Sequence, residues 1–89
     1  VVLNNRSYYN DEEHQERMAR AHQRWIENKG IGIRIEDPAP DLGAIARALH
    51  VDAFGPVTEP DQLGSTLDKA IAIVESGKPA VVDVITQPR

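Results

Sequence analysis

Short apolar runs recur along the chain and are separated by longer polar segments. The runs at residues 1–3, 51–57 and 80–86 are rich in β-branched residues and too short for most helices, so each predicts a strand. The run at 80–86 has the composition of a strand buried in a parallel sheet. Residues 31–35 alternate apolar with small or polar side chains, which predicts a short strand or an extended connection.

Three segments between these runs have helical spacing. Residues 11–28 predict a surface or interface helix with little apolar face, with Asn10 or Asp11 as N-cap. Residues 42–50 predict a second helix, capped by Asp41. The third is expected to start with Thr58 as its cap and to end at Gly77, with an apolar stripe of Leu63, Leu67, Ala70, Ile71 and Val74. Because strands alternate with helices, the fold class is α/β with a mostly parallel sheet.

Composition excludes several classes of site. The 89 residues contain no cysteine, so disulfides, cysteine-based zinc sites and thiol nucleophiles are ruled out. The net charge of −4 comes without a basic stripe, so we expect no nucleic-acid partner. No apolar run approaches the roughly 20 residues that cross a bilayer, so we expect no membrane partner. The chain begins inside an apolar strand without Met, and we expect it to be the carboxyl-terminal part of a longer protein.

Two adjacent asparagines, Asn4 and Asn5, follow the first strand. Ligands of open α/β sheets bind beyond the carboxyl ends of the strands, and an amide oxygen there can bind a hard cation such as magnesium. Asparagine also favours turns, because its side chain caps its own backbone and tolerates the left-handed conformation. The dipeptide alone leaves both interpretations open.

Together with four later blocks, Leu3-Asn4-Asn5 resembles the thiamine diphosphate-dependent enzymes. It is similar to the end of their cofactor motif, in which Gly-Asp-Gly is followed by Asn-Asn. The later blocks are Pro-Asp-Leu-Gly-Ala-Ile-Ala-Arg-Ala-Leu (40–49), Phe-Gly-Pro-Val (54–57), Glu-Pro-Asp-Gln-Leu (59–63) and Gly-Lys-Pro-Ala-Val-Val-Asp-Val (77–84). Residues 1–89 thus resemble the second half of the carboxyl-terminal cofactor-binding domain of acetolactate synthase-like and benzoylformate decarboxylase-like enzymes. The resemblance implies a three-layer sandwich, present here as a partial domain.

The same resemblance implies a cofactor site. Thiamine diphosphate and Mg²⁺ would be the cofactors, with the Asn5 side chain and the Ser7 carbonyl as metal ligands, and Asn4 holding the turn. The cofactor-binding residues would be Asn4, Asn5, Arg6, Ser7 and Tyr8. No catalytic residue is assigned in this chain, because in the family the Gly-Asp-Gly aspartate lies upstream and the activating glutamate comes from another domain, generally of a partner subunit. The isolated chain is therefore expected to be inactive.

The resemblance also implies a reaction class: carboligation of a 2-oxo acid, as in acetolactate synthase. A 2-oxo acid decarboxylase or aldehyde lyase is the alternative within the family, and a non-catalytic α/β interaction module is the alternative outside it. The segment after the asparagines, from Tyr8 to His14, is more polar than in many acetolactate synthases. We expect the rest of a parent chain, a second subunit in a homodimer or homotetramer, and a cytoplasmic location.

Other residues have more than one interpretation. His14, His22 and His50 are expected to be exposed, with proton transfer by His14 as the alternative. The acidic residues at 11–13 are interpreted as first-turn charges that the helix dipole favours, with an acid/base pair as the alternative. Tyr8 and Tyr9 suit a substrate contact, a subunit contact or packing over the sheet edge, and Trp25 suits an interface or packing position better than a substrate platform. Asp83 interrupts an apolar strand and is expected near its exposed end, with a buried functional carboxylate as the alternative.

Overall fold

The computed structural model describes residues 1–87, which divide into two compact units. The sheet unit consists of Val1–Asn4 and Asp41–Thr86. The helix–loop unit consists of Asn5–Pro40, together with Gln87 at the end of the described chain. Each unit is described by itself below.

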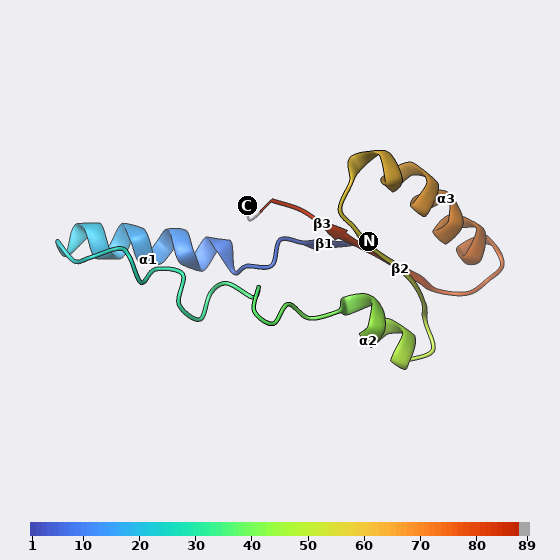
Figure 1. Cartoon of the computed structure of the whole chain (residues 1–89), viewed down its shortest axis with the longest axis horizontal. Helices are drawn as coiled ribbons and strands as arrows, with labels where there is room; N and C mark the ends of the chain where they lie inside the picture. Colours follow the sequence, from blue (N-terminus) through green and yellow to red (C-terminus); the bar gives the residue numbers. More distant parts are fainter. Residues whose placement is uncertain (88–89) are drawn as a thin grey trace. The chain divides into compact units, whose positions relative to one another are not determined.

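The sheet unit contains three parallel strands (Figure 1): β1 (Val2–Asn4), β2 (Asp52–Val57) and β3 (Ala80–Ile85). Their order is β1-β3-β2, so the β-branched β3 lies in the centre and pairs with both neighbours. This confirms the prediction of an α/β fold with a parallel sheet. β1 is an edge strand of the described sheet, and its Leu3 is 71% exposed.

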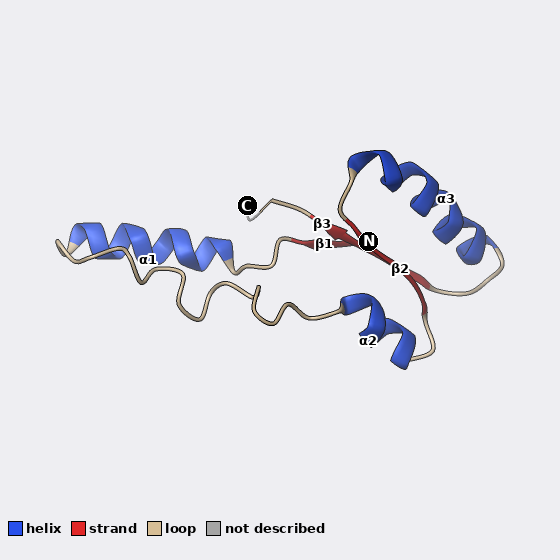
Figure 2. Ribbon diagram, viewed as in Figure 1, coloured by secondary structure: helices blue, strands red, loops and turns tan. Residues whose placement is uncertain are grey.

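Two helices lie on opposite sides of this sheet (Figure 2): α2 (Leu42–Ala48) and α3 (Pro60–Glu75). The Asp41 carboxylate caps α2 as predicted, accepting a hydrogen bond from the Ala44 N–H at 2.7 Å. The predicted Thr58 cap of α3 is wrong, because the N-cap is Glu59 and Pro60 occupies the first turn. The helix–sheet–helix layering agrees with the expected sandwich.

The apolar core lies between α3 and the sheet. Val57, Ala70 and Val82 are buried there, and the partly buried residues packed against them are Phe54, Leu63, Leu67, Ala80 and Val84. The predicted stripe of α3 is therefore only partly correct. Ile71 and Val74 are 52% and 55% exposed, because the face of α3 that contacts the sheet is narrower than its apolar stripe.

A glycine lies at an irregularity in the pairing of β2 with β3. The pairing register shifts between Phe54 and Val57, and Gly55 between them has a φ of +106°. A Cβ on Gly55 would lie 2.3 Å from the Asp83 carbonyl oxygen. Only glycine fits this backbone conformation and this distance.

The helix–loop unit begins with α1 (Tyr9–Ala21), which differs from the expected helix at both ends. Its N-cap is Tyr8 and makes no side-chain capping hydrogen bond, so neither Asn10 nor Asp11 is the cap. The helix ends seven residues before Asn28, because Gln23 adopts a left-handed backbone with a φ of 54°. The helical spacing in the sequence continues past this point, but the helix itself ends here.

The loop that follows α1 forms one antiparallel bridge to the start of the unit, between Ser7 and Arg34. Two hydrogen bonds flank it: the Tyr8 N–H donates to the Ile33 carbonyl at 3.0 Å and the Ile35 N–H donates to the Arg6 carbonyl at 2.8 Å. Residues 31–35, predicted to be a short strand or an extended connection, form only this single bridge. Turn hydrogen bonds to the Gly30 carbonyl curl the chain just before it.

Candidate functional site

Asn4 is the last residue of β1, at the edge of the sheet where its parallel strands end. It pairs in register with Ile85, the last residue of β3, and its carbonyl oxygen accepts a hydrogen bond from the Thr86 N–H at 3.0 Å. The structure therefore places the first asparagine at the end of a strand, as the sequence predicted. Ligands of open α/β sheets bind at this edge.

The Asn4 side chain is directed into the sheet unit. Asn4 is 9% exposed, and its Nδ2 donates to the Asp83 Oδ2 at 3.5 Å. This amide contacts β3, and the role of Asn4 in the turn stays a prediction. The side chain of the next residue makes the turn.

The Asn5 side chain closes a tight turn. Its Oδ1 accepts a hydrogen bond from the Ser7 N–H at 3.2 Å, and the intervening Arg6 is half-buried with a left-handed φ of 50°. An amide oxygen has two lone pairs, so this hydrogen bond leaves Oδ1 able to contact a cation. The two interpretations of the asparagine pair, turn and ligand, are thus compatible in one residue.

Ser7 has a backbone carbonyl that the neighbouring bridge does not use. The two flanking hydrogen bonds involve groups of Arg6 and Tyr8, so Ser7 belongs to a non-hydrogen-bonded antiparallel pair. In such a pair the N–H and C=O point away from the opposite strand. The Ser7 Oγ is buried and has no hydrogen-bond partner among the described residues. Ser7 therefore offers a neutral oxygen next to that of Asn5.

A cavity of about 410 Å³ lies beside this turn, within the helix–loop unit. Tyr8, which is 60% exposed, and Tyr9, which is half-buried, form part of its wall. The full lining is Asn5, Ser7, Tyr8, Tyr9, Asn10, Asp11 and Glu13. Both predicted metal-ligating residues thus face one cavity, together with two carboxylates and two tyrosines.

Comparison with known families identifies the chain. Residues 1–84 match the family described as thiamine pyrophosphate enzyme, C-terminal TPP binding domain. The chain belongs to this family. No curated protein and no solved structure matches it significantly.

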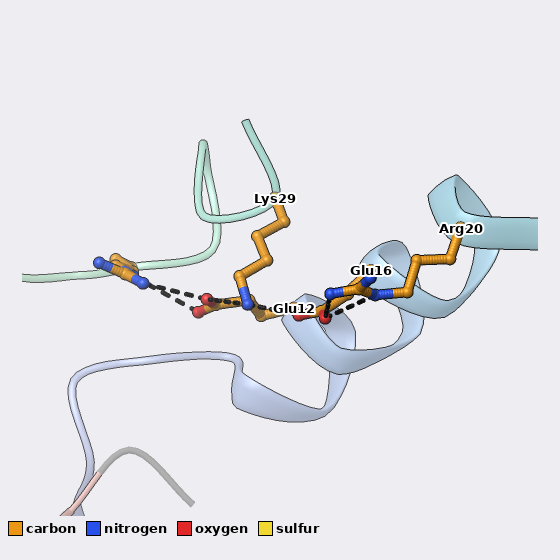
Figure 3. A network of polar contacts seen from close by, with 5 residues as sticks. Glu12, Glu16, Arg20 and Lys29 are labelled. Atoms are coloured by element: carbon orange, nitrogen blue, oxygen red, sulfur yellow. Dashed lines mark hydrogen bonds and ion pairs between the residues drawn. The ribbon is translucent and has the colours of Figure 1, made fainter. Parts of the chain in front are cut away.

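In this TPP-binding domain a buried carboxylate of α1 organises a charged network (Figure 3). Glu12 is 5% exposed and pairs with the Arg34 guanidinium through hydrogen bonds of 3.0 and 3.4 Å. The Lys29 Nζ lies 3.7 Å from Glu12 Oε1 and also pairs with Glu16, which in turn binds Arg20 at 2.7 Å. The network joins α1 to the loop that follows it.

The network shifts the pKa values of its members toward their charged forms. The hydrogen bond from Arg34 lowers the pKa of Glu12, and the hydrogen bond from Lys29 lowers the pKa of Glu16. The pKa of Lys29 is raised mainly by the hydrogen bond to Glu16. The sequence suggested only a helix-dipole role for Glu12, because Arg34 lies 22 residues away and no local spacing connects the two.

Asp83 lies at the centre of the sheet, so its expected place near an exposed strand end is wrong. It is 2% exposed, and its Oδ1 has no hydrogen-bond partner within residues 1–87. The apolar composition of β3 predicted a buried strand but did not show which strands pair with it. β3 pairs with a strand on each side, so Asp83 is not at a sheet edge, and its side chain points to the face opposite Val82 and Val84.

The remaining candidates lie on the surface. His14, His22 and His50 are exposed, as expected, and Trp25 is 84% exposed in the loop beyond α1. The described part of the TPP-binding domain contains no group of three His, Cys, Asp or Glu side chains that could hold a metal ion. Within residues 1–87 no helix combines the length and apolar character that crossing a membrane requires.

Proposed function

We propose that this domain binds thiamine diphosphate and Mg²⁺ in an enzyme that acts on 2-oxo acids, by carboligation like that of acetolactate synthase. The observation that carries the proposal is the Asn5–Ser7 turn, which follows directly after β1 and lines the cavity. Family membership supports the thiamine diphosphate cofactor itself. Asn4, Arg6 and Tyr8 complete the proposed cofactor-binding segment.

The two oxygens of the turn suit magnesium. Mg²⁺ prefers oxygen ligands in octahedral geometry and takes only a few from protein when phosphates contribute. Asn5 Oδ1 and the Ser7 carbonyl are both neutral, so they bind the metal without adding negative charge beside a diphosphate. Asp11 and Glu13 on the cavity wall are acidic, and a bare diphosphate would be repelled there. A divalent cation would remove that repulsion.

The reaction itself depends on the cofactor. When bound, thiamine diphosphate supplies the thiazolium carbanion that cleaves and forms carbon–carbon bonds. The residues of this chain would hold the metal and shape the wall near the substrate. The sequence contains no Gly-Asp-Gly, so the other protein ligand of the metal would come from elsewhere in a longer parent chain. We also propose a homodimer or homotetramer, in the cytoplasm, whose partner subunit supplies the activating glutamate.

The polar cavity supports a second candidate reaction. Asn10, Asp11 and Glu13 give its wall more hydrogen-bonding groups than an apolar acceptor pocket would need. A simple 2-oxo acid decarboxylase or aldehyde lyase is therefore the alternative. Carboligation produces a longer 2-hydroxy-oxo acid, whereas decarboxylation releases an aldehyde. Product analysis with a panel of 2-oxo acids separates the two.

Substitution of the metal ligand tests the proposal. In the enzyme that carries this chain, Asn5→Ala is expected to weaken Mg²⁺-dependent binding of thiamine diphosphate by about 100-fold, since loss of even an indirect metal contact costs about 10–100-fold. Titration calorimetry at fixed cofactor and varied Mg²⁺ measures the change. Asn10→Ala, on the same cavity wall, is the matched control and should change this affinity little. Unchanged affinity in Asn5→Ala would show that the ligand assignment is wrong.

A further inference from the structure

Asp83 is a buried carboxylate whose side-chain hydrogen bond comes from a neutral amide. The donor is Asn4, whose Nδ2 lies 3.5 Å from Oδ2. The second oxygen, Oδ1, has no partner within the described chain. A carboxylate in such a place costs folding free energy relative to an apolar residue of the same size. Its neighbours on the same face of β3, Val81 and Ile85, are apolar.

The backbone around Asp83 is held on both sides. On one side it pairs in register with Val2 of β1. On the other, β2 approaches so closely that a Cβ on Gly55 would meet the Asp83 carbonyl oxygen at 2.3 Å. Asp83 thus lies in the central strand of the described sheet, between β1 and β2. Its carboxylate can therefore accept a hydrogen bond from a side chain of a neighbouring strand.

The side chain that donates this hydrogen bond is that of Asn4. In β1 the side chains of Val2 and Asn4 point to the same face, because side chains alternate along a strand. Since Val2 lies opposite Asp83, the Asn4 amide is a diagonal neighbour of the carboxylate on that face. The Asn4 amide donates from Nδ2 to the Asp83 Oδ2, so its NH₂ group faces the carboxyl group of Asp83. The pair therefore fixes the rotamer of Asn4 as well as its position.

We propose that Asp83 is a positioning residue for the cofactor site, acting through Asn4. β1 is only three residues long and pairs with one strand, so few backbone hydrogen bonds hold its end. The Asn4–Asp83 hydrogen bond anchors the last residue of β1, and the next residue is Asn5. This inference rests on the proposed function, in which Asn5 and Ser7 bind the metal. Asp83 itself contacts neither metal nor cofactor.

Substitutions of Asp83 in the enzyme that carries this chain test the inference. Asp83→Leu keeps the number and branching of the side-chain heavy atoms and removes the acceptor, whereas Asp83→Asn keeps one acceptor oxygen. We expect Asp83→Leu to raise the Mg²⁺ concentration for half-maximal thiamine diphosphate binding by about 10–100-fold, as for other residues that orient metal ligands. Asp83→Asn should have a smaller effect on the Mg²⁺ requirement.

A swapped pair separates positioning from general structural damage. In the double variant Asn4→Asp with Asp83→Asn, the amide and the carboxylate exchange places, so the hydrogen bond can form again. We expect the swap to restore most of the Mg²⁺ affinity that Asn4→Asp alone loses. If Asp83→Leu does not fold, the comparison of the swap with Asn4→Asp alone still decides. A swap no better than Asn4→Asp would overturn the inference.

Asn5→Ala, measured in parallel, distinguishes failure of the positioning role from failure of the metal site. If Asn5→Ala weakens Mg²⁺-dependent binding while Asp83→Leu does not, the positioning role is wrong and the proposed function stands. If neither substitution changes the binding, the proposed metal site itself is wrong. Loss of Mg²⁺ affinity in both, with restoration by the swap, is the expected result.

Discussion

Gly55 offers a direct test of the close contact between β2 and β3. In Gly55→Ala the new Cβ would lie 2.3 Å from the Asp83 carbonyl oxygen, so one backbone must retreat by about 1 Å to reach ordinary van der Waals distance. Overpacking of this kind costs about 1–3 kcal/mol. The φ of +106° adds a backbone cost of about 1–3 kcal/mol for any residue with a Cβ. We therefore expect a loss of about 2–6 kcal/mol in the free energy of unfolding.

Two other glycines separate the two contributions. Gly77 has a φ of +87°, and a Cβ added to it would meet no atom within 4 Å, so Gly77→Ala has the backbone cost alone. Gly64 lies inside α3 at an ordinary φ and is equally open. Gly64→Ala should be stabilising by about 0.5–1 kcal/mol, because alanine is the better helix former. The expected order of stability is thus Gly64→Ala, wild type, Gly77→Ala, Gly55→Ala.

Denaturant unfolding of the protein, with hydrogen–deuterium exchange of β2 and β3, measures both the size and the location of the effect. Faster exchange in Gly55→Ala should be concentrated in these two strands. Gly77→Ala should instead affect the end of α3. If Gly55→Ala is no more destabilising than Gly77→Ala, the close approach of β2 to Asp83 is incorrect.

The remaining predictions concern charges at α1 and α2. Because the Arg34 hydrogen bond lowers the pKa of Glu12 below its ordinary value of 4.5, its stabilisation is complete above that pH and is lost as pH falls through the lower pKa of the folded state. Glu12→Gln should accelerate amide exchange in the helix–loop unit at pH 7 and flatten this acid dependence, whereas Glu13→Gln, in an exposed pair, should do neither. Asp41→Ala removes the cap on the Ala44 N–H and should cost about 1 kcal/mol in denaturant unfolding; no change would show that the cap does not contribute.

The sheet was predictable because its signals are local. The β-branched run that forms β3 and the stripe of α3 report burial through composition and period, and Asp41 reports a helix start through one capping interaction. The end of α1 was not predictable in the same way. Polar residues with good helical spacing continue to Asn28, but Gln23 takes a left-handed conformation that its residue type does not announce.

The candidate site was predictable in its residues but not in its contacts. The position of Asn4 and Asn5 after a strand follows from the apolar run before them. The division of roles between their side chains depends on which face of β1 is covered and on Asp83, which is 79 residues away from Asn4. The burial of Glu12 likewise depends on Arg34 across a loop. No local pattern in the sequence predicts contacts between residues that are so far apart along the chain.

The two units are stabilised by different forces, and the proposed metal ligands belong to the one that depends on charge. The sheet unit buries an apolar cluster, whereas Ile33 is the one apolar side chain buried in the described part of the helix–loop unit. Exposed ion pairs contribute little and are screened by salt, so Glu12 with its low exposure is the pair member whose removal matters most. Asn5 and Ser7 lie in this charge-stabilised unit, while Asn4 lies in the apolar one. The position of Asn4 should therefore depend little on salt, whereas the exposed ion pairs of the unit that contains Asn5 and Ser7 should weaken as ionic strength rises.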